Sequence, residues 1–319
     1  MVLGYLQKIG QRRIIQAENS RFFAPFKIVG KECGAKIGDK ILAKFDRWDS
    51  PAPTPSCRIL RVLGPGGEPM TDHLGILAKY GLSSKFPEKV VKEASKSPDQ
   101  VRTSDRKGRR DYRKHFTFTI DPLDARDFDD AISIRKLEND QTEIGVHIAD
   151  VSAYVAPGSA LDKEARRRGN STYLVGEVVP MLPQKLSNGI CSLVEGEERL
   201  VKSILFRFGK GGKIIRSELA ECVIKSDKRL TYEQAGLLMR EDDLEAIRSA
   251  KPPESRYSGN PGKPLASLNN TSLRKFQVTI RELWAFASRL RQDRMQAGAL
   301  LLEGAEVKIL VDQQGAPES

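Results

Sequence analysis

The sequence is poor in the residues that build zinc sites and disulfide frameworks. It contains only three histidines and four cysteines, with no Cys-x-x-Cys pair and no two histidines close together. This scarcity argues against a zinc site and against a histidine-based catalytic triad. We expect the scattered cysteines to be free thiols in a reducing compartment. They are Cys33, Cys57, Cys191 and Cys222.

Long apolar runs are also missing. The first residues, Met1–Arg13, lack the apolar core of a signal peptide, and no later run is long enough to span a bilayer. The chain also has no basic amphipathic anchor for a membrane surface. We therefore expect a cytoplasmic protein with no membrane partner.

Acidic residues are fewer than basic ones. There are 42 Asp and Glu against 53 Lys and Arg, which gives a net charge of +11. Such an excess favours a polyanionic partner, because lysine and arginine neutralise phosphates and release counterions. A well-solvated basic surface explains the charge equally well. With 39% hydrophobic residues, the 319-residue chain is able to bury real cores, and its length predicts two or three units.

Residues 1–85 form a β-rich region. Strands are predicted at 22–29, 40–45 and 58–63, and the last is closed by Gly64–Gly67. Short strands with Gly/Pro turns are typical of a small OB-like barrel, which presents basic and aromatic residues to single-stranded nucleic acid. The alternative is a small β domain that keeps Phe22 and Phe23 in its core.

The next region, 86–112, changes character and is predicted to be a basic linker. A short helix over 87–96 precedes a basic run from Arg106 to Lys114. The charges of this run either are solvated or act together with the acidic segment that follows.

From residue 113 to 319 the pattern mixes strands and helices. Ser159 begins a helix that Gly169 ends, and arginines at 166–168 either favour the helix dipole or contact phosphate. A capping box at Thr231 begins another helix, and a long helix is predicted over 272–296. Residues 251–265 form a Pro/Gly loop, and 307–311 suggest a last strand. Helical spacing assigns these side chains of the long helix to the core: Phe276, Ile280, Leu283, Ala287 and Leu290.

The most informative segment is acidic. The alternating residues Phe116–Ile120 predict a strand, Pro122 keeps Asp121 extended at its end, and a second strand is predicted over Ala131–Ile134. Between the two strands lies a loop with five aspartates and one arginine, a net charge of −4.

Carboxylates packed so closely repel one another, and a divalent cation removes that cost. Oxygen ligands without His or Cys favour Mg²⁺ or Mn²⁺, and two such ions are able to hydrolyse a phosphodiester. A solvated acidic loop is the alternative. A calcium-binding EF-hand fails, because Ala131 and Ile132 occupy positions that need a ligand and a glycine.

The segment 120–131 resembles the signature of the RNase II/RNase R catalytic domain, the RNB domain. Four further blocks follow in the order of that family: 147–152, 180–183, 186–193 and Arg229–Tyr232. The resemblance runs from about residue 113 to the end, and residues 1–85 resemble the cold-shock domain that precedes it. It implies an α+β chain, with a cold-shock-like OB barrel followed by a mixed α/β RNB domain.

This resemblance implies a 3′-to-5′ exoribonuclease that hydrolyses single-stranded RNA to nucleoside 5′-monophosphates. It makes Asp121 and Asp130 metal ligands, assigns Asp127 to the support of the site, and makes Asp129 the least replaceable residue for cleavage. Tyr173 matches a tyrosine that stacks on a base, with a core tyrosine as the alternative. We expect Mg²⁺, or Mn²⁺, as the cofactor, with no organic cofactor, and a monomer of RNase R type.

The family domain continues beyond the point that matches Ser319, so we expect an RNB domain incomplete at its C-terminus. A second hypothesis is therefore a catalytically incomplete RNA-binding fragment. A third is a small-molecule metallohydrolase that uses the same aspartates, which the basic charge and the β-rich front region disfavour.

Overall fold

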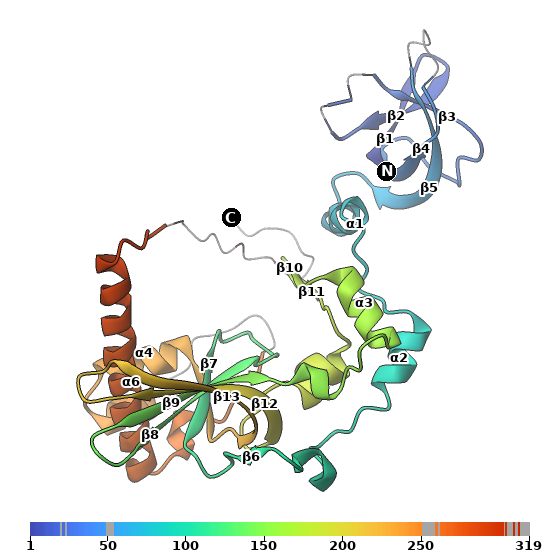
Figure 1. Ribbon diagram of the computed structural model, residues 1–319. Helices are drawn as coiled ribbons and strands as arrows, with labels where there is room; N and C mark the ends of the chain where they lie inside the picture. Colours follow the sequence, from blue (N-terminus) through green and yellow to red (C-terminus); the bar gives the residue numbers. More distant parts are fainter. Residues whose placement is uncertain are drawn as a thin grey trace. The chain divides into compact units, whose positions relative to one another are not determined.

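The computed structural model describes residues 1–302, apart from 20, 23, 49–53, 251–258 and 261, together with 304, 309 and 312. These residues form two compact units (Figure 1). The first contains Met1–Phe86, Ser171–Val179 and the described residues Ile309 and Asp312, and the second contains Pro87–Asn170 and the described residues of Pro180–Ala305. Among the described residues, no helix is long and apolar enough to cross a membrane.

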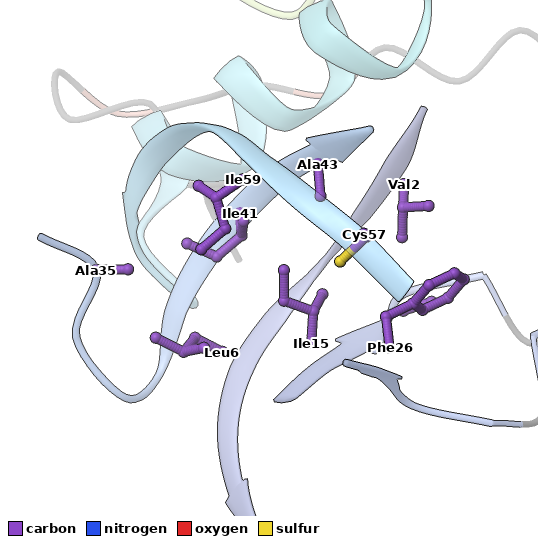
Figure 2. Close-up of a cluster of buried hydrophobic side chains, with 10 residues drawn as sticks. Val2, Leu6, Ile15, Phe26, Ala35, Ile41, Ala43, Cys57 and Ile59 are labelled. Atoms are coloured by element: carbon purple, nitrogen blue, oxygen red, sulfur yellow. The ribbon is translucent and has the colours of Figure 1, made fainter. Parts of the chain in front are cut away.

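The first unit is built on a closed β-barrel. Its strands are β1 (Val2–Ile9), β2 (Arg12–Ala17), β3 (Phe26–Ile28), β4 (Asp39–Phe45) and β5 (Ser56–Pro65), paired in the order β1-β2-β3-β5-β4 with β4 returning to β1. Side chains that alternate along the strands fill the interior, among them Leu6, Ile15, Phe26 and Ile41 (Figure 2). Closure pairs every strand on both sides and leaves no open sheet edge.

The predicted strands of this region agree with the structure in two of three cases. β4 and β5 cover the strands predicted over 40–45 and 58–63, whereas only Phe26–Ile28 of the strand predicted over 22–29 is extended. Phe22 is 37% exposed, so its assignment to the core is wrong, and Phe23 lies outside the described residues. Phe26 takes the core position instead and packs edge-to-face against Phe22.

Helix α1 (Pro69–Lys79) follows the barrel and is joined to it through a buried lysine. The Lys40 ammonium on β4 donates to Glu18 at 3.0 Å and to Asp72 of α1 at 2.8 Å, with a side chain only 4% exposed. Pairing with two carboxylates offsets the cost of burying this charge.

A seven-stranded mixed sheet forms the centre of the second unit. Its order is β14-β7-β8-β9-β12-β13-β6, in which the outer strands β14 and β6 run parallel to their neighbours and the inner pairs are antiparallel. The strands are β6 (Arg110–Asp111), β7 (Thr117–Asp121), β8 (Asp130–Lys136), β9 (Thr142–Ala149), β12 (Glu198–Phe208), β13 (Ile214–Lys225) and β14 (Lys228–Thr231).

One face of this sheet is covered by the helices α4 (Tyr232–Arg240), α5 (Leu244–Ser249) and α6 (Asn270–Gln296). Phe118 of β7 and Leu230 of β14 pack here against Phe276 and Ile280 of α6. The capping box predicted at Thr231 is present, and Asn269 caps α6. The remaining helices of this unit are α2 (Glu88–Ala94), η1 (Thr103–Arg106), η2 (Val151–Ala153), α3 (Ala160–Arg168), η3 (Lys185–Ile190) and η4 (Leu265–Ser267).

The other face of the sheet has its own apolar cluster, in which Tyr112 and Phe128 are the largest members. The region 86–112, expected as a basic linker, contains α2, η1 and β6. The segment therefore brings ordered elements to the edge of the sheet.

The core assignment along α6 is right only for its first half. Phe276 and Ile280 are buried and Leu283 is packed against the same cluster, but Ala287 and Leu290 are exposed. The helix is longer than the face of the sheet it covers among the described residues, so helical spacing alone does not place its last turns. The strand predicted at 307–311 lies outside the described residues, except Ile309.

We expect Phe118→Ala to lower the free energy of unfolding of the second unit by about 3–5 kcal/mol, because it opens a cavity among fully buried rings. Phe118 is completely buried and lies 5.7 Å from Phe276, ring centre to ring centre. Urea denaturation followed through Trp284 of α6, in a Trp48→Phe background, measures this unit alone. The control is Leu219→Ala, at a residue of β13 that is 79% exposed. A similar loss in both variants would show that Phe118 is not a core residue.

Candidate metal centre

The acidic loop connects two antiparallel neighbours in the sheet. Thr117 of β7 faces Ser133 of β8, and Phe118 faces Ile132. β7 ends at Asp121 and β8 begins at Asp130, so the loop joins the neighbouring ends of two paired strands. The loop therefore returns its second group of aspartates to the strand end that carries the first.

Alternation along β7 decides which way Asp121 points. Phe116, Phe118 and Ile120 pack into the cluster under the helices. Because successive side chains of a strand point to opposite faces, Asp121 lies on the face away from the helices.

Phe128 anchors the middle of the loop. Its side chain is fully buried, its amide donates to the Ser192 hydroxyl at 3.0 Å, and its carbonyl accepts from the Leu193 amide at 2.9 Å. The Asp129 carbonyl in turn accepts from the Ala149 amide of β9 at 2.9 Å. The backbone of Phe128 and Asp129 is thus held by residues outside the loop.

Asp121 is the buried member of the acidic group. It is 8% exposed, and its Oδ2 atom has no hydrogen-bond partner among the described residues. Burial is the main cause that raises the pKa of Asp121 above its ordinary value, and the charges of Asp130 and Asp129 raise it further, whereas the neighbouring Thr119 hydroxyl and then Arg229 lower it. A buried carboxylate oxygen without a partner is costly, so its retention needs an explanation.

Asp129 and Asp130 are exposed, and Asp127 is half-buried. Nearby protein displaces part of the water around the Asp129 carboxylate and raises its pKa, and the charges of Asp127 and Asp130 raise it further. The four predicted site residues therefore influence one another electrostatically, which a fully solvated loop does not explain.

Within the described part of the chain, no group of three or more His, Cys, Asp and Glu side chains is close enough to hold a metal ion. The carboxylates thus do not form a complete protein cage. Mg²⁺ does not need one, because it is usually bound through one or two carboxylates and completes its octahedron with water and substrate phosphate. The orphan oxygen of Asp121 is a hard donor of the kind that such an ion prefers.

Tyr173 lies on a small hairpin of the first unit, formed by β10 (Thr172–Leu174) and β11 (Glu177–Val179). Its side chain is 65% exposed, so the alternative of a core tyrosine is wrong. Glu177 of the same hairpin pairs with His73 of α1, which connects the hairpin to the barrel unit.

Many of the arginines considered as phosphate contacts have carboxylate partners within the second unit. Arg166 pairs with Asp162, and Arg167 and Arg168 both pair with Glu164 one turn earlier. In the basic run before the acidic loop, Arg109 is bonded to buried Asp150 at 2.6 Å. These pairs favour a structural role over phosphate contact, because each guanidinium is already engaged.

Sequence reasoning missed the residues that hold the loop. Ser192 and Arg229 were recognised only as parts of two family blocks, without a role. Both residues lie far along the chain from the aspartates, so the sequence does not show that they contact the loop. For Arg229, strand pairing makes the contact, because Leu230 of β14 lies beside Ile120 of β7.

Comparison with known proteins agrees with this architecture. Residues 109–319 match the RNB domain, and residues 14–87 match a cold shock domain. The chain belongs to the RNB-domain family. The predicted fold, a cold-shock-like barrel followed by a mixed α/β RNB domain, is therefore confirmed.

The RNB-domain relatives include ribonucleases. Ribonuclease R of Thermotoga maritima is 40% identical over 285 residues, which cover 88% of this chain and 37% of that relative. The solved structure of Mycoplasma genitalium RNase R with double-stranded RNA has the same fold, with a TM-score of 0.81 and 23% identity over 99% of this chain and 52% of that one. Yeast Ssd1, described as a pseudonuclease, matches with a TM-score of 0.62 and 20% identity over 79% of this chain and 32% of its own. The chain thus spans well under half the length of the Thermotoga relative.

His147 belongs to a family block but not to the metal centre. It is fully buried in β9, with its two ring nitrogens 2.8 Å from the hydroxyls of Ser203 and Ser133. Burial, followed by the charge of His115, lowers its pKa from 6.5 to about 4.

We expect the second unit to lose stability as the pH falls from 6.5 towards 4, because the unfolded chain then binds a proton that folded His147 does not. For this one group the loss is about 2 kcal/mol at pH 5. Urea denaturation of the same unit at pH 7 and pH 5 measures it. A His147→Gln variant should lack this part of the pH dependence, and an unchanged dependence in that variant would contradict the assignment.

Proposed function

We propose that this chain carries the metal-binding part of a 3′-to-5′ exoribonuclease that hydrolyses single-stranded RNA to nucleoside 5′-monophosphates with Mg²⁺, or Mn²⁺, as its cofactor. The observation that carries the proposal is the buried Asp121 oxygen without a partner, set among further aspartates whose charges act on it. Membership of the RNB-domain family and the ribonuclease relatives support the same activity.

Asp121 and Asp130 are the residues that we assign as metal ligands. They stand at the two ends of the acidic loop, at the end of β7 and the start of β8. When bound, the divalent ion supplies an activated water and stabilises charge on the leaving oxygen. Asp127 adds negative charge beside Asp129, and exposed Asp129 is the carboxylate best placed to orient water or accept its proton.

Tyr173 and the barrel are the parts that we assign to RNA binding. An exposed aromatic ring stacks on any base without reading its sequence. The net charge of +11 attracts the phosphate backbone of the same ligand.

The second candidate function is RNA binding without cleavage. It is favoured by the lack of a three-ligand cluster among the described residues. The match to Ssd1 shows that the fold alone does not assign catalysis.

We expect Asp129→Asn to slow the release of mononucleotides from a labelled single-stranded oligoribonucleotide by about 100-fold or more, because it removes a carboxylate from the metal-assisted step. Binding of the same RNA should change little. Product analysis with Mg²⁺ and with EDTA measures the effect, and EDTA should abolish release by the unaltered chain.

The matched control is Asp140→Asn. Asp140 is an exposed aspartate in the turn after β8, with a left-handed φ of 56° that asparagine also tolerates. Equal turnover by Asp129→Asn and Asp140→Asn would refute the catalytic assignment. Salt-sensitive RNA binding with no release under either metal would instead establish the second candidate.

We expect Tyr173→Ala to weaken binding of single-stranded RNA by about 1–3 kcal/mol, because stacking on the ring is lost. Tyr173→Phe should bind normally, since stacking does not need the hydroxyl. Tyr80→Ala removes a tyrosine of similar exposure, 67%, from the same unit and serves as the control. Fluorescence anisotropy with a labelled oligonucleotide measures all three, and a similar loss in the Tyr80 variant would deny Tyr173 a specific role.

A further inference from the structure

The structure assigns to Arg229 a role as positioning residue for the acidic loop: its guanidinium fixes the separation of Asp121 and Asp129. The inference rests on the proposed function, because Asp121 would hold the divalent ion and Asp129 would orient its water. Arg229 lies on β14 and is fully buried.

One planar group touches both sides of the loop. The Arg229 guanidinium donates to the carbonyl oxygen of Pro122, the residue after Asp121. Its central carbon also lies 5.3 Å from the centre of the Phe128 ring, the residue before Asp129. The contact with Phe128 is of cation–π type, which is strongest when both groups are removed from water.

Arg229 is itself held independently of the loop. Its strand pairs with β7 in parallel, with Arg229 beside Thr119. Its backbone amide donates to Glu195 at 3.1 Å, and the same carboxylate accepts from the Lys228 ammonium at 2.8 Å. The position of Arg229 is therefore set by contacts outside the acidic loop.

The charge of Arg229 and its positioning of the loop have opposite expected effects on metal binding. A positive charge near Asp121 disfavours a cation at that carboxylate, so an Arg229 that acted only by its charge would weaken metal binding. An Arg229 that acts by position would strengthen it. Lysine keeps the charge but has no planar fork to bond a carbonyl while lying on a ring, so Arg229→Lys and Arg229→Met separate the two effects.

Hydrogen exchange on the full 319-residue chain without metal tests the positioning directly. The two reporter amides are Ala125, which donates to the Pro122 carbonyl at 3.1 Å, and Leu193, which donates to the Phe128 carbonyl at 2.9 Å. Both Arg229 variants should lose protection at these amides. The control Arg281→Met removes a cation of α6 that contacts Leu238, Glu241 and Asp242 rather than the loop or Glu195, and should keep that protection.

Titration with Mn²⁺, followed by electron paramagnetic resonance, gives the second readout. We expect the Kd for Mn²⁺ to rise by about 10–100-fold in both Arg229 variants, as for other residues that orient metal ligands. Arg281→Met should leave the Kd for Mn²⁺ unchanged. Tighter Mn²⁺ binding by Arg229→Met, with no change in Arg229→Lys, would show a charge effect and overturn the proposal.

The two readouts distinguish a failure of the proposed function from a failure of the positioning role of Arg229. If the unaltered chain binds no Mn²⁺, the proposed function fails, while the exchange experiment still decides the role of Arg229. Equal protection in the Arg229 variants and the unaltered chain, or an equal loss in Arg281→Met, overturns the positioning role. If the Arg229 variants do not fold, Phe128→Leu removes the aromatic ring that Arg229 contacts. Unchanged protection of the Leu193 amide in that variant would also overturn the positioning role.

Discussion

Mutual repulsion among the carboxylates of one short loop is the constraint around which the second unit is organised. The ten residues from Asp121 to Asp130 include five aspartates and one arginine, and the first aspartate is buried at a strand end. Such an arrangement persists only if the surrounding structure holds it. The holding groups come from elsewhere in the chain: Ser192 and Leu193 after η3, Ala149 of β9, and Arg229 of β14.

The sheet explains why these distant groups meet. β7 lies between β8 and β14, so the loop that leaves β7 is reached from one side by its own hairpin partner and from the other by Arg229. The helix-covered face supplies the large aromatic core, with Phe118 against Phe276. The opposite face is left for Asp121. The aromatic core and Asp121 lie on opposite faces because side chains alternate along β7.

The sequence predicted local structure best where a local signal is complete. The helix that begins after Ser159 and the capping box at Thr231 agree with the structure, because each needs only residues within one turn. The strand predicted at 22–29 is longer than the one observed, since only Phe26–Ile28 is extended. The core positions Ala287 and Leu290 were wrong, because these two side chains satisfy the helical pattern but find no packing surface among the described residues. The strands β1 and β2 were not singled out at all, although their region was recognised as β-rich.

The candidate site also has features that the sequence predicted and features that it did not. The sequence by itself determined which residues carry the charge, that they lie between two strands, and which family the motif resembles, because these are properties of neighbouring residues. Only the tertiary structure decided that the Asp121 oxygen is buried without a partner, that Tyr173 is exposed, and that Arg229 touches both sides of the loop. Burial and contact depend on residues as far as 107 positions away, and no local pattern of amino acids encodes where those residues come to lie.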